Sequence, residues 1–349
     1  MNIENLVRSN IIQLKPYRSA RQDHSGGILL DANENAYGSP VQLDALELNR
    51  YPDPYQSVLR KRVAEINNTQ MENVFIGSGS DEVIDLLYRV FCDPAVDNVI
   101  IPEPTYGMYR VSADIHNVPV KSSLLTDEFQ LDREDILRQV DESTKMVFCC
   151  SPNNPTGNLL SEEDIFHLCN AINALIIVDE AYVEFADSES LVRHIAEYPN
   201  LVVMRTFSKS WGLAGIRVGY CVGHSAIIKY LQKVKAPYNV NSVSASLALK
   251  ALEVQSERKQ IVDTIRKERE RLIEQLGKLA FVKQIYSSDA NFFLIRVNNP
   301  RGVYTKLIDK GIIIRDRSNQ PKLTGCIRIT VGTPQQNDAL IKAMEGISE

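Results

Sequence analysis

The sequence lacks the features that mark a membrane protein, an exported protein or a nucleic-acid-binding protein. Its longest apolar runs, such as residues 174–178, are far shorter than the roughly 20 residues of a membrane-spanning helix. The amino-terminal MNIENLVRSN carries charges where a secretory signal needs an apolar segment. The 39 basic residues are outnumbered by 44 acidic ones, giving a net charge of −5, which disfavours contact with nucleic-acid phosphates. We therefore expect a cytoplasmic protein that binds neither membranes nor nucleic acid.

Cysteine and histidine are also too sparse for a disulfide framework or a metal site. The six cysteines form no CxxC pair, so we interpret them as reduced residues, several of them buried. The five histidines are scattered and show no HExxH or other paired spacing. The sequence thus predicts no metal bound by the protein itself.

Between about residues 70 and 225, short apolar runs alternate with segments of helical periodicity. Such alternation is typical of a mainly parallel sheet covered by helices on both faces. Ser161 is a candidate helix cap, and residues 81–91 are apolar on most sides, as in a buried helix. The predicted strands are 74–76, 99–101, 146–150, 175–178, 201–204 and 217–222.

The pattern changes after about residue 240. Residues 257–276 have a helical apolar stripe that ends before Gly277, and strands are predicted at 291–297 and 326–331. These elements indicate a second, smaller α+β domain. We predict an N-terminal arm at 1–36, a large α/β domain at 37–240 and a small C-terminal domain at 241–349.

Polar residues follow four of the predicted strands, where open parallel sheets bind their ligands. The first loop, GSGSDE at 77–82, combines glycines with a helix start and so favours a phosphate, although small residues at such turns are also common. Neither GxGxxG nor GxxxxGK[ST] occurs, which removes the main support for a dinucleotide or P-loop site. The second loop, SPNNPTG at 151–157, is either a rigid turn or a loop whose Asn154 amide donates a hydrogen bond to a ligand oxygen.

The other two loops contain a carboxylate and a lysine. Asp179 ends an apolar strand, where a carboxylate is costly to bury unless it meets a cation or a proton donor; the alternative is that it caps a helix. Lys209 follows another apolar strand and is flanked by hydroxyls and Phe207, although a lone lysine usually lies in solvent. Together with Asn154, Tyr182 and the phosphate loop, these residues supply the groups that pyridoxal phosphate needs.

The motifs around these residues extend over nearly the whole chain. In these motifs the sequence resembles the fold-type-I aminotransferases of class II. Within that family it is most similar to the subgroup that acts on L-histidinol phosphate. One departure is Ala36, where this subgroup commonly has proline. The segments that carry the resemblance are Pro16-Tyr17, Ala20-Arg21, NEN at 33–35, RYPDP at 50–54, GSGSDE at 77–82, PTYG at 104–107, SPNNPTG at 151–157, VDEAYVEF at 178–185, TFSKSWGLAGIRVGY at 206–220, IIIRD at 312–316 and CIRITVGT at 326–333.

The resemblance implies a role for each matching position. Lys209 is expected to bond to the cofactor aldehyde, Asp179 to pair with the pyridinium nitrogen, and Asn154 and Tyr182 to bind the phenolate oxygen. Tyr106 is expected to stack on the cofactor ring. The phosphate would be bound by Gly79, Ser80, Asp81, Thr206, Ser208, Arg217 and, from the neighbouring subunit of a homodimer, Tyr51.

The implied substrates are anionic. Arg315 and Arg328 are expected to bind the phosphate of L-histidinol phosphate and then the second substrate, 2-oxoglutarate, which leaves as glutamate. Tyr17 and Arg21 would close over the substrate from the N-terminal arm. The alternative role for Arg315 or Arg328 is a surface salt bridge.

Other functions on the same scaffold stay open. An aromatic-amino-acid aminotransferase or an L-threonine-O-3-phosphate decarboxylase would keep Lys209, Asp179 and Asn154, so these residues do not discriminate among them. A non-catalytic regulator built on this scaffold would need an added DNA-binding segment. The chain has neither the spare length nor a basic recognition helix for one.

Overall fold

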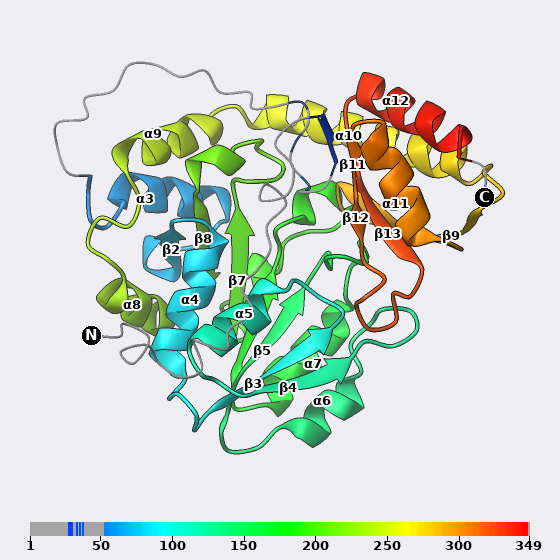
Figure 1. Cartoon of the computed structure of the whole chain (residues 1–349). Helices are drawn as coiled ribbons and strands as arrows, with labels where there is room; N and C mark the ends of the chain where they lie inside the picture. The colour runs from blue at the N-terminus through cyan, green and yellow to red at the C-terminus, as the bar shows by residue number, and fades with distance from the viewer. Residues whose placement is uncertain (1–26, 31–32, 34, 36, 38–51, 348–349) are drawn as a thin grey trace, which may run out of the picture.

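A computed structural model of the chain describes residues 27–30, 33, 35, 37 and 52–347. A seven-stranded sheet forms its larger part, with the strand order β2-β8-β7-β6-β5-β3-β4 (Figure 1). All neighbouring strands run parallel except β8, which is antiparallel to both β2 and β7. The strands are β2 (Val74–Gly77), β3 (Asn98–Glu103), β4 (Val120–Leu124), β5 (Thr144–Cys150), β6 (Leu175–Asp179), β7 (Leu201–Thr206) and β8 (Gly219–Gly223).

Helices cover both faces of this sheet, because its central strands are apolar on both sides and need a core on each. One core packs beneath α4 (Ser80–Phe91), α5 (Met108–Ile115) and α8 (Ser225–Val234). The other lies beneath α3 (Ser57–Ile66), α6 (Arg133–Gln139), α7 (Glu162–Ala171) and α9 (Ser242–Ala251). The Ser161 hydroxyl accepts the backbone N–H of Asp164 and so caps α7, as the sequence predicts.

A smaller antiparallel sheet, ordered β12-β13-β10-β9, lies beside the large one (Figure 1). The helix α10 (Gln255–Leu276) precedes this sheet in the chain. The sheet has its own hydrophobic core, separate from the two cores of the large sheet. Residues Ile28–Leu29 form β1, which pairs in parallel with β11. The remaining elements are β9 (Val282–Ile285), β10 (Phe292–Val297), α11 (Pro300–Asp309), β11 (Ile312–Ile313), β12 (Arg315–Asp316), β13 (Cys326–Thr330), α12 (Pro334–Glu345) and the 3₁₀ helices η2 (Met71–Asn73), η3 (Val183–Phe185), η4 (Leu191–His194) and η5 (Ala214–Ile216).

The α/β fold expected from the sequence is confirmed, with two differences among the strands of the large sheet. Strand β4 was not predicted because it is an edge strand of alternating exposure that contains two serines. The predicted strand at 217–222 instead begins at Gly219, since Arg217 adopts a left-handed conformation with φ of 51° at the end of η5. The domain boundaries at residues 36 and 240 remain predictions. Within the described ranges, no helix is both long and apolar enough to cross a membrane.

Candidate active site

The strands β5, β6 and β7 are parallel neighbours, so their carboxyl ends and the predicted site residues that follow them lie at the same end of the large sheet. Asp179 is the last residue of β6 and pairs in register with Cys150 of β5 and Met204 of β7. The backbone N–H of Ser151 donates to the Asp179 carbonyl at 2.9 Å. The loops that carry Asn154 and Lys209 therefore begin beside Asp179.

Asp179 is 4% exposed, and both of its carboxylate oxygens accept hydrogen bonds. Tyr109 Oη donates to Oδ2 at 2.7 Å, and the backbone N–H of Ala181 donates to Oδ1 at 3.1 Å. Burial raises the pKa of Asp179 to about 6, while these hydrogen bonds and the charge of Lys209 act in the opposite direction. A buried carboxylate held this way is prepared to face a cation.

Sequence reasoning missed Tyr109, although it lies only three residues after Tyr106. Its ring is fully buried and stacks on Phe148 with centroids 4.8 Å apart. The hydroxyl then reaches Asp179, which is 70 positions away in the chain. Helical spacing could have placed Tyr109 in the core, but no sequence pattern shows which group its hydroxyl meets.

The Tyr182 hydroxyl lies beside two side-chain amides. It accepts from Asn33 Nδ2 at 3.2 Å and from Asn154 Nδ2 at 3.5 Å. Burial raises the pKa of Tyr182 well above its ordinary value, so the phenol stays protonated at neutral pH. Lys209 Nζ lies 5.6 Å from the centre of the Tyr182 ring. An amine, a phenol and an amide thus share one small region.

The loop after β2 forms the start of α4, where backbone N–H groups and the helix dipole favour an anion. Gly79 adopts φ of +79°, and a Cβ there would lie 2.6 Å from Arg217 Nη2. The same guanidinium contacts Asp81 Oδ2 at 3.3 Å and donates to Ser208 Oγ at 3.5 Å. Ser80 is the first residue of α4.

Two further predicted residues join this cluster. The Tyr106 hydroxyl donates to Asp81 Oδ1 at 3.2 Å, and its ring meets Tyr109 edge-on at 5.5 Å. Thr206 ends β7, and its Oγ1 accepts the backbone N–H of Ser208 at 3.0 Å. Glycine, hydroxyls and a guanidinium are the groups that bind a phosphate.

Two arginines lie opposite each other on the smaller sheet. Arg315 of β12 and Arg328 of β13 are paired in register. Arg328 is 3% exposed, its guanidinium lies 5.1 Å from the Phe292 ring centre, and its Nη1 donates to Asn154 Oδ1. The smaller sheet therefore carries positive charge directly to the Asn154 loop. Tyr17, Arg21 and Tyr51 fall outside the described residues.

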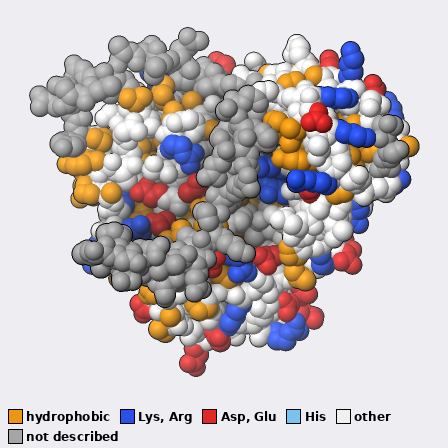
Figure 2. Space-filling model, in the orientation of Figure 1, with side chains coloured by type: hydrophobic (Ala, Val, Ile, Leu, Met, Phe, Trp, Pro, Cys, Tyr) orange, Lys and Arg blue, Asp and Glu red, His pale blue; other side chains and the backbone are white. Residues whose placement is uncertain are grey.

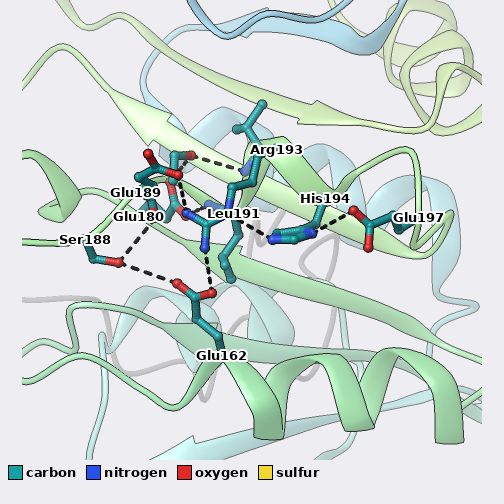
Figure 3. A network of polar contacts seen from close by, with 10 residues as sticks. Glu162, Glu180, Ser188, Glu189, Leu191, Arg193, His194 and Glu197 are labelled. Carbon is teal, nitrogen blue, oxygen red and sulfur yellow. Dashed lines mark hydrogen bonds and ion pairs between the residues drawn. The ribbon is translucent and has the colours of Figure 1, made fainter.

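Glu180 follows Asp179 but serves the structure behind the site. Its carboxylate accepts from Ser190 Oγ at 2.5 Å and from the Leu191 backbone N–H at 2.6 Å, which holds η4 against β6 (Figure 3). Burial raises the pKa of Glu180 to about 7. Nearby, Arg193 pairs with Glu162 at 2.7 Å (Figure 3). Among the residues that the structure describes, no group of His, Cys, Asp and Glu could hold a metal ion.

The site fits pyridoxal phosphate on observations independent of any relative. A Cβ at Gly79 would occupy the anion cradle, which is consistent with a phosphate approaching the backbone there. Asp179 provides a buried carboxylate for a protonated ring nitrogen. Lys209 provides an amine beside two hydrogen-bond donors, Asn154 and Tyr182.

Comparison with known proteins gives the class and then the closer relatives. Residues 25–344 match the family described as aminotransferase class I and II, and the chain belongs to this family. The histidinol-phosphate aminotransferase of Cytophaga hutchinsonii is 44% identical, with 99% of each chain covered. That of Flavobacterium johnsoniae is also 44% identical and covers 99% of this chain and 98% of its own. The expected family is confirmed.

Solved structures share the fold. The histidinol-phosphate aminotransferase of Clostridium acetobutylicum has a TM-score of 0.80 at 29% identity and covers 86% of this chain and 90% of its own. The enzyme of Sinorhizobium meliloti in complex with pyridoxal-5'-phosphate has a TM-score of 0.86 at 23% identity, with 98% of each chain covered.

Proposed function

We propose that the protein transfers the amino group of L-histidinol phosphate to 2-oxoglutarate, giving imidazole acetol phosphate and L-glutamate in histidine biosynthesis. The observation that carries this proposal is the buried guanidinium of Arg328, which donates to Asn154 Oδ1 and belongs to a residue paired in register with Arg315. Full-length identity of 44% to histidinol-phosphate aminotransferases supports it independently.

Pyridoxal phosphate is the proposed cofactor, and when bound it supplies an electron sink for the charge left at the substrate α-carbon. Asp179 holds the proton on the pyridine nitrogen, which an ionised buried carboxylate does well. Asn154 and Tyr182 donate to the phenolate oxygen. Gly79, Ser80, Asp81, Tyr106, Thr206, Ser208 and Arg217 bind the phosphate and cover the ring.

Lys209 is the proposed base. Once its Nζ is free and neutral, it would remove the α-proton of the substrate and deliver that proton to the carbon of the cofactor aldehyde group. Its Nζ lies 5.6 Å from the centre of the Tyr182 ring, so the proposed base is close to the group proposed to bind the phenolate oxygen.

The same two arginines serve both substrates in turn. Arg315 and Arg328 bind the phosphate of the donor and later the distal carboxylate of 2-oxoglutarate, since a guanidinium fork matches either anion. Arg328 also orients Asn154 through its contact with Oδ1. Tyr17 and Arg21 are proposed to close over the substrate.

A cytoplasmic homodimer is the proposed assembly, with Tyr51 reaching the cofactor phosphate of the neighbouring subunit. Large apolar side chains next to that position support it: Tyr55 is 57% exposed and Val58 is 68% exposed. Figure 2 shows hydrophobic side chains along the left edge of the face drawn, in the region of α3 and α9. Burying such a patch against a second copy is favourable.

Donor profiling tests the substrate. The purified enzyme would be assayed with 2-oxoglutarate and, separately, L-histidinol phosphate, L-histidinol, an aromatic amino acid and O-phospho-L-threonine. We expect glutamate formation with L-histidinol phosphate and a kcat/KM lower by about 100-fold or more for unphosphorylated L-histidinol, because two charge-assisted contacts are lost. Preference for the aromatic amino acid, or carbon dioxide release from O-phospho-L-threonine without an oxo acid, would contradict the proposal.

A further inference from the structure

The turn that carries Lys209 is covered by a side chain from a distant helix. Trp211, the single tryptophan of the sequence, lies two residues after Lys209 and is 4% exposed. The backbone N–H of Gly212 donates to the Lys209 carbonyl at 3.1 Å, so the indole belongs to the same tight turn. The guanidinium carbon of Arg258, in the first turns of α10, lies 4.3 Å from the indole ring centre. This is close cation–π contact.

Arg258 is itself held by a buried acid. Glu184 Oε1 accepts from Arg258 Nη1 at 3.5 Å and from Arg205 Nη2 at 2.7 Å, and the Glu184 side chain is 9% exposed. Glu184 lies two residues after Tyr182, and Arg205 directly precedes Thr206. One small network therefore joins the segments that carry Tyr182, Thr206 and Lys209.

The other end of α10 is fixed to the smaller sheet. Leu272 and Leu276 are fully buried in the core that also contains Phe292. Arg269 Nη1 donates to the Ala290 carbonyl at 2.7 Å, and Arg271 pairs with Asp338 of α12 at 2.7 Å. The helix thus connects the sheet that carries Arg315 and Arg328 to the Lys209 turn, and Figure 1 shows it spanning the two parts.

We propose that Arg258 is a positioning residue: it holds Trp211, and through it the Lys209 turn, in place against Glu184 and α10. The consequence is that the Lys209 amine keeps its position beside the Tyr182 ring. Arg258 touches no proposed reacting atom, so it acts through its contacts with Trp211 and Glu184. Its effect on turnover rests on the proposed role of Lys209.

Because the chain has one tryptophan, the contact can be measured without cofactor or substrate. Intrinsic fluorescence of cofactor-free protein would be quenched with acrylamide in wild type, in Arg258→Ala and in Lys259→Ala, an exposed neighbour on the same helix. Loss of the covering guanidinium should raise the quenching constant about twofold or more in Arg258→Ala alone. Equal quenching in the three proteins would overturn the contact.

Positioning is tested by the rate at which each cofactor-free protein bonds to pyridoxal 5′-phosphate, read from visible absorbance, and by a split in the steady-state constants. Arg258→Ala should slow the bonding and lower kcat by about tenfold or more, since small displacements of a reacting group are costly. KM for L-histidinol phosphate should change less than about twofold, because the arginines of the smaller sheet are untouched. Arg258→Lys, which retains a cation over the ring, should recover part of each loss.

The outcomes separate this inference from the proposed function. Inactive wild type would contradict the function, while quenching and cofactor bonding would still decide the role of Arg258. Raised quenching with unchanged bonding rate and kcat would overturn the positioning role. Should Arg258→Ala fail to fold, Arg258→Met, which keeps much of the side-chain length but no charge, takes its place in the same measurements, and wild-type values throughout in that variant would count against the inference.

Discussion

Removing the Tyr109 hydroxyl should change the pH range in which the protein binds its cofactor. In Tyr109→Phe, Asp179 Oδ2 loses a 2.7 Å hydrogen bond inside a site where the aspartate is 4% exposed. Such a bond to a charged group contributes about 1.5–3 kcal/mol. At about 1.4 kcal/mol per pKa unit, the Asp179 pKa should rise by about 1–2 units. It starts at about 6 in the wild type.

The consequence follows from the protonation state of Asp179. Only the ionised carboxylate holds a proton on the pyridine nitrogen, so affinity for pyridoxal 5′-phosphate falls as Asp179 becomes protonated. Wild type should lose affinity below about pH 6, and the variant already below about pH 7–8. At pH 7 the variant's dissociation constant should be about two- to tenfold higher from protonation alone.

The assay is a spectroscopic titration of cofactor-free protein with pyridoxal 5′-phosphate at a series of pH values. Tyr88→Phe is the matched control, since the Tyr88 ring is fully buried in the same core and its hydroxyl donates to the Tyr109 carbonyl, not to Asp179. The cofactor phosphate titrates in both variants, so its contribution to the pH profile cancels when the two are compared. A pH profile in Tyr109→Phe that coincides with that of Tyr88→Phe would refute the reasoning.

Three further changes test other parts of the site. Gly79→Ala should weaken cofactor binding about tenfold or more, because Gly79 has a positive φ and the new Cβ would lie 2.6 Å from a guanidinium nitrogen. Gly215→Ala is the control and should bind as wild type, since a Cβ there meets nothing within 4 Å. Equal affinities of the two variants in a cofactor titration would contradict the role of Gly79 in phosphate binding. Arg328→Lys should raise KM for both L-histidinol phosphate and 2-oxoglutarate about tenfold or more. Arg301→Lys, at an exposed position, is the control. A change in KM for one substrate alone would exclude a shared anion site. Burial raises the pKa of Glu180 from 4.5 to about 7, so the folded protein keeps a proton that the unfolded chain releases, and the free energy of unfolding should fall by about 3 kcal/mol as pH rises from 4.5 to 7. Thermal melts of cofactor-free Glu180→Gln should lack that decline relative to wild type, and parallel pH profiles would contradict the assignment.

Much of the large sheet could be predicted because its strands are continuous apolar runs that end in polar loops. The loop of Gly79, Asp179 at the end of β6 and Lys209 in the loop after β7 follow directly from that pattern. Strand β4 escaped prediction because an edge strand needs no apolar face on both sides. Arg217 was predicted in a strand because nothing in the neighbouring sequence indicates that its backbone adopts a left-handed conformation.

Contacts between distant segments could not be predicted from one sequence. Tyr109 meets Asp179, and Arg258 covers Trp211, only because the fold brings their segments together. Asn33 lies in a motif noted in the sequence, yet its hydrogen bond to the Tyr182 hydroxyl depends on the path of the chain before α3. Periodicity shows that a residue is buried, but it does not show which polar group it faces.

The proposed cofactor and donor substrate are tested together by the visible absorption spectrum of the purified protein, recorded before and after adding L-histidinol phosphate without an oxo acid. We expect a yellow band that disappears as the bound cofactor accepts the amino group, and no such band in Lys209→Ala loaded with the same cofactor. A band that stays unchanged on adding L-histidinol phosphate would contradict the substrate. The absence of any band in the wild type, even after pyridoxal 5′-phosphate is added, would contradict the cofactor site itself.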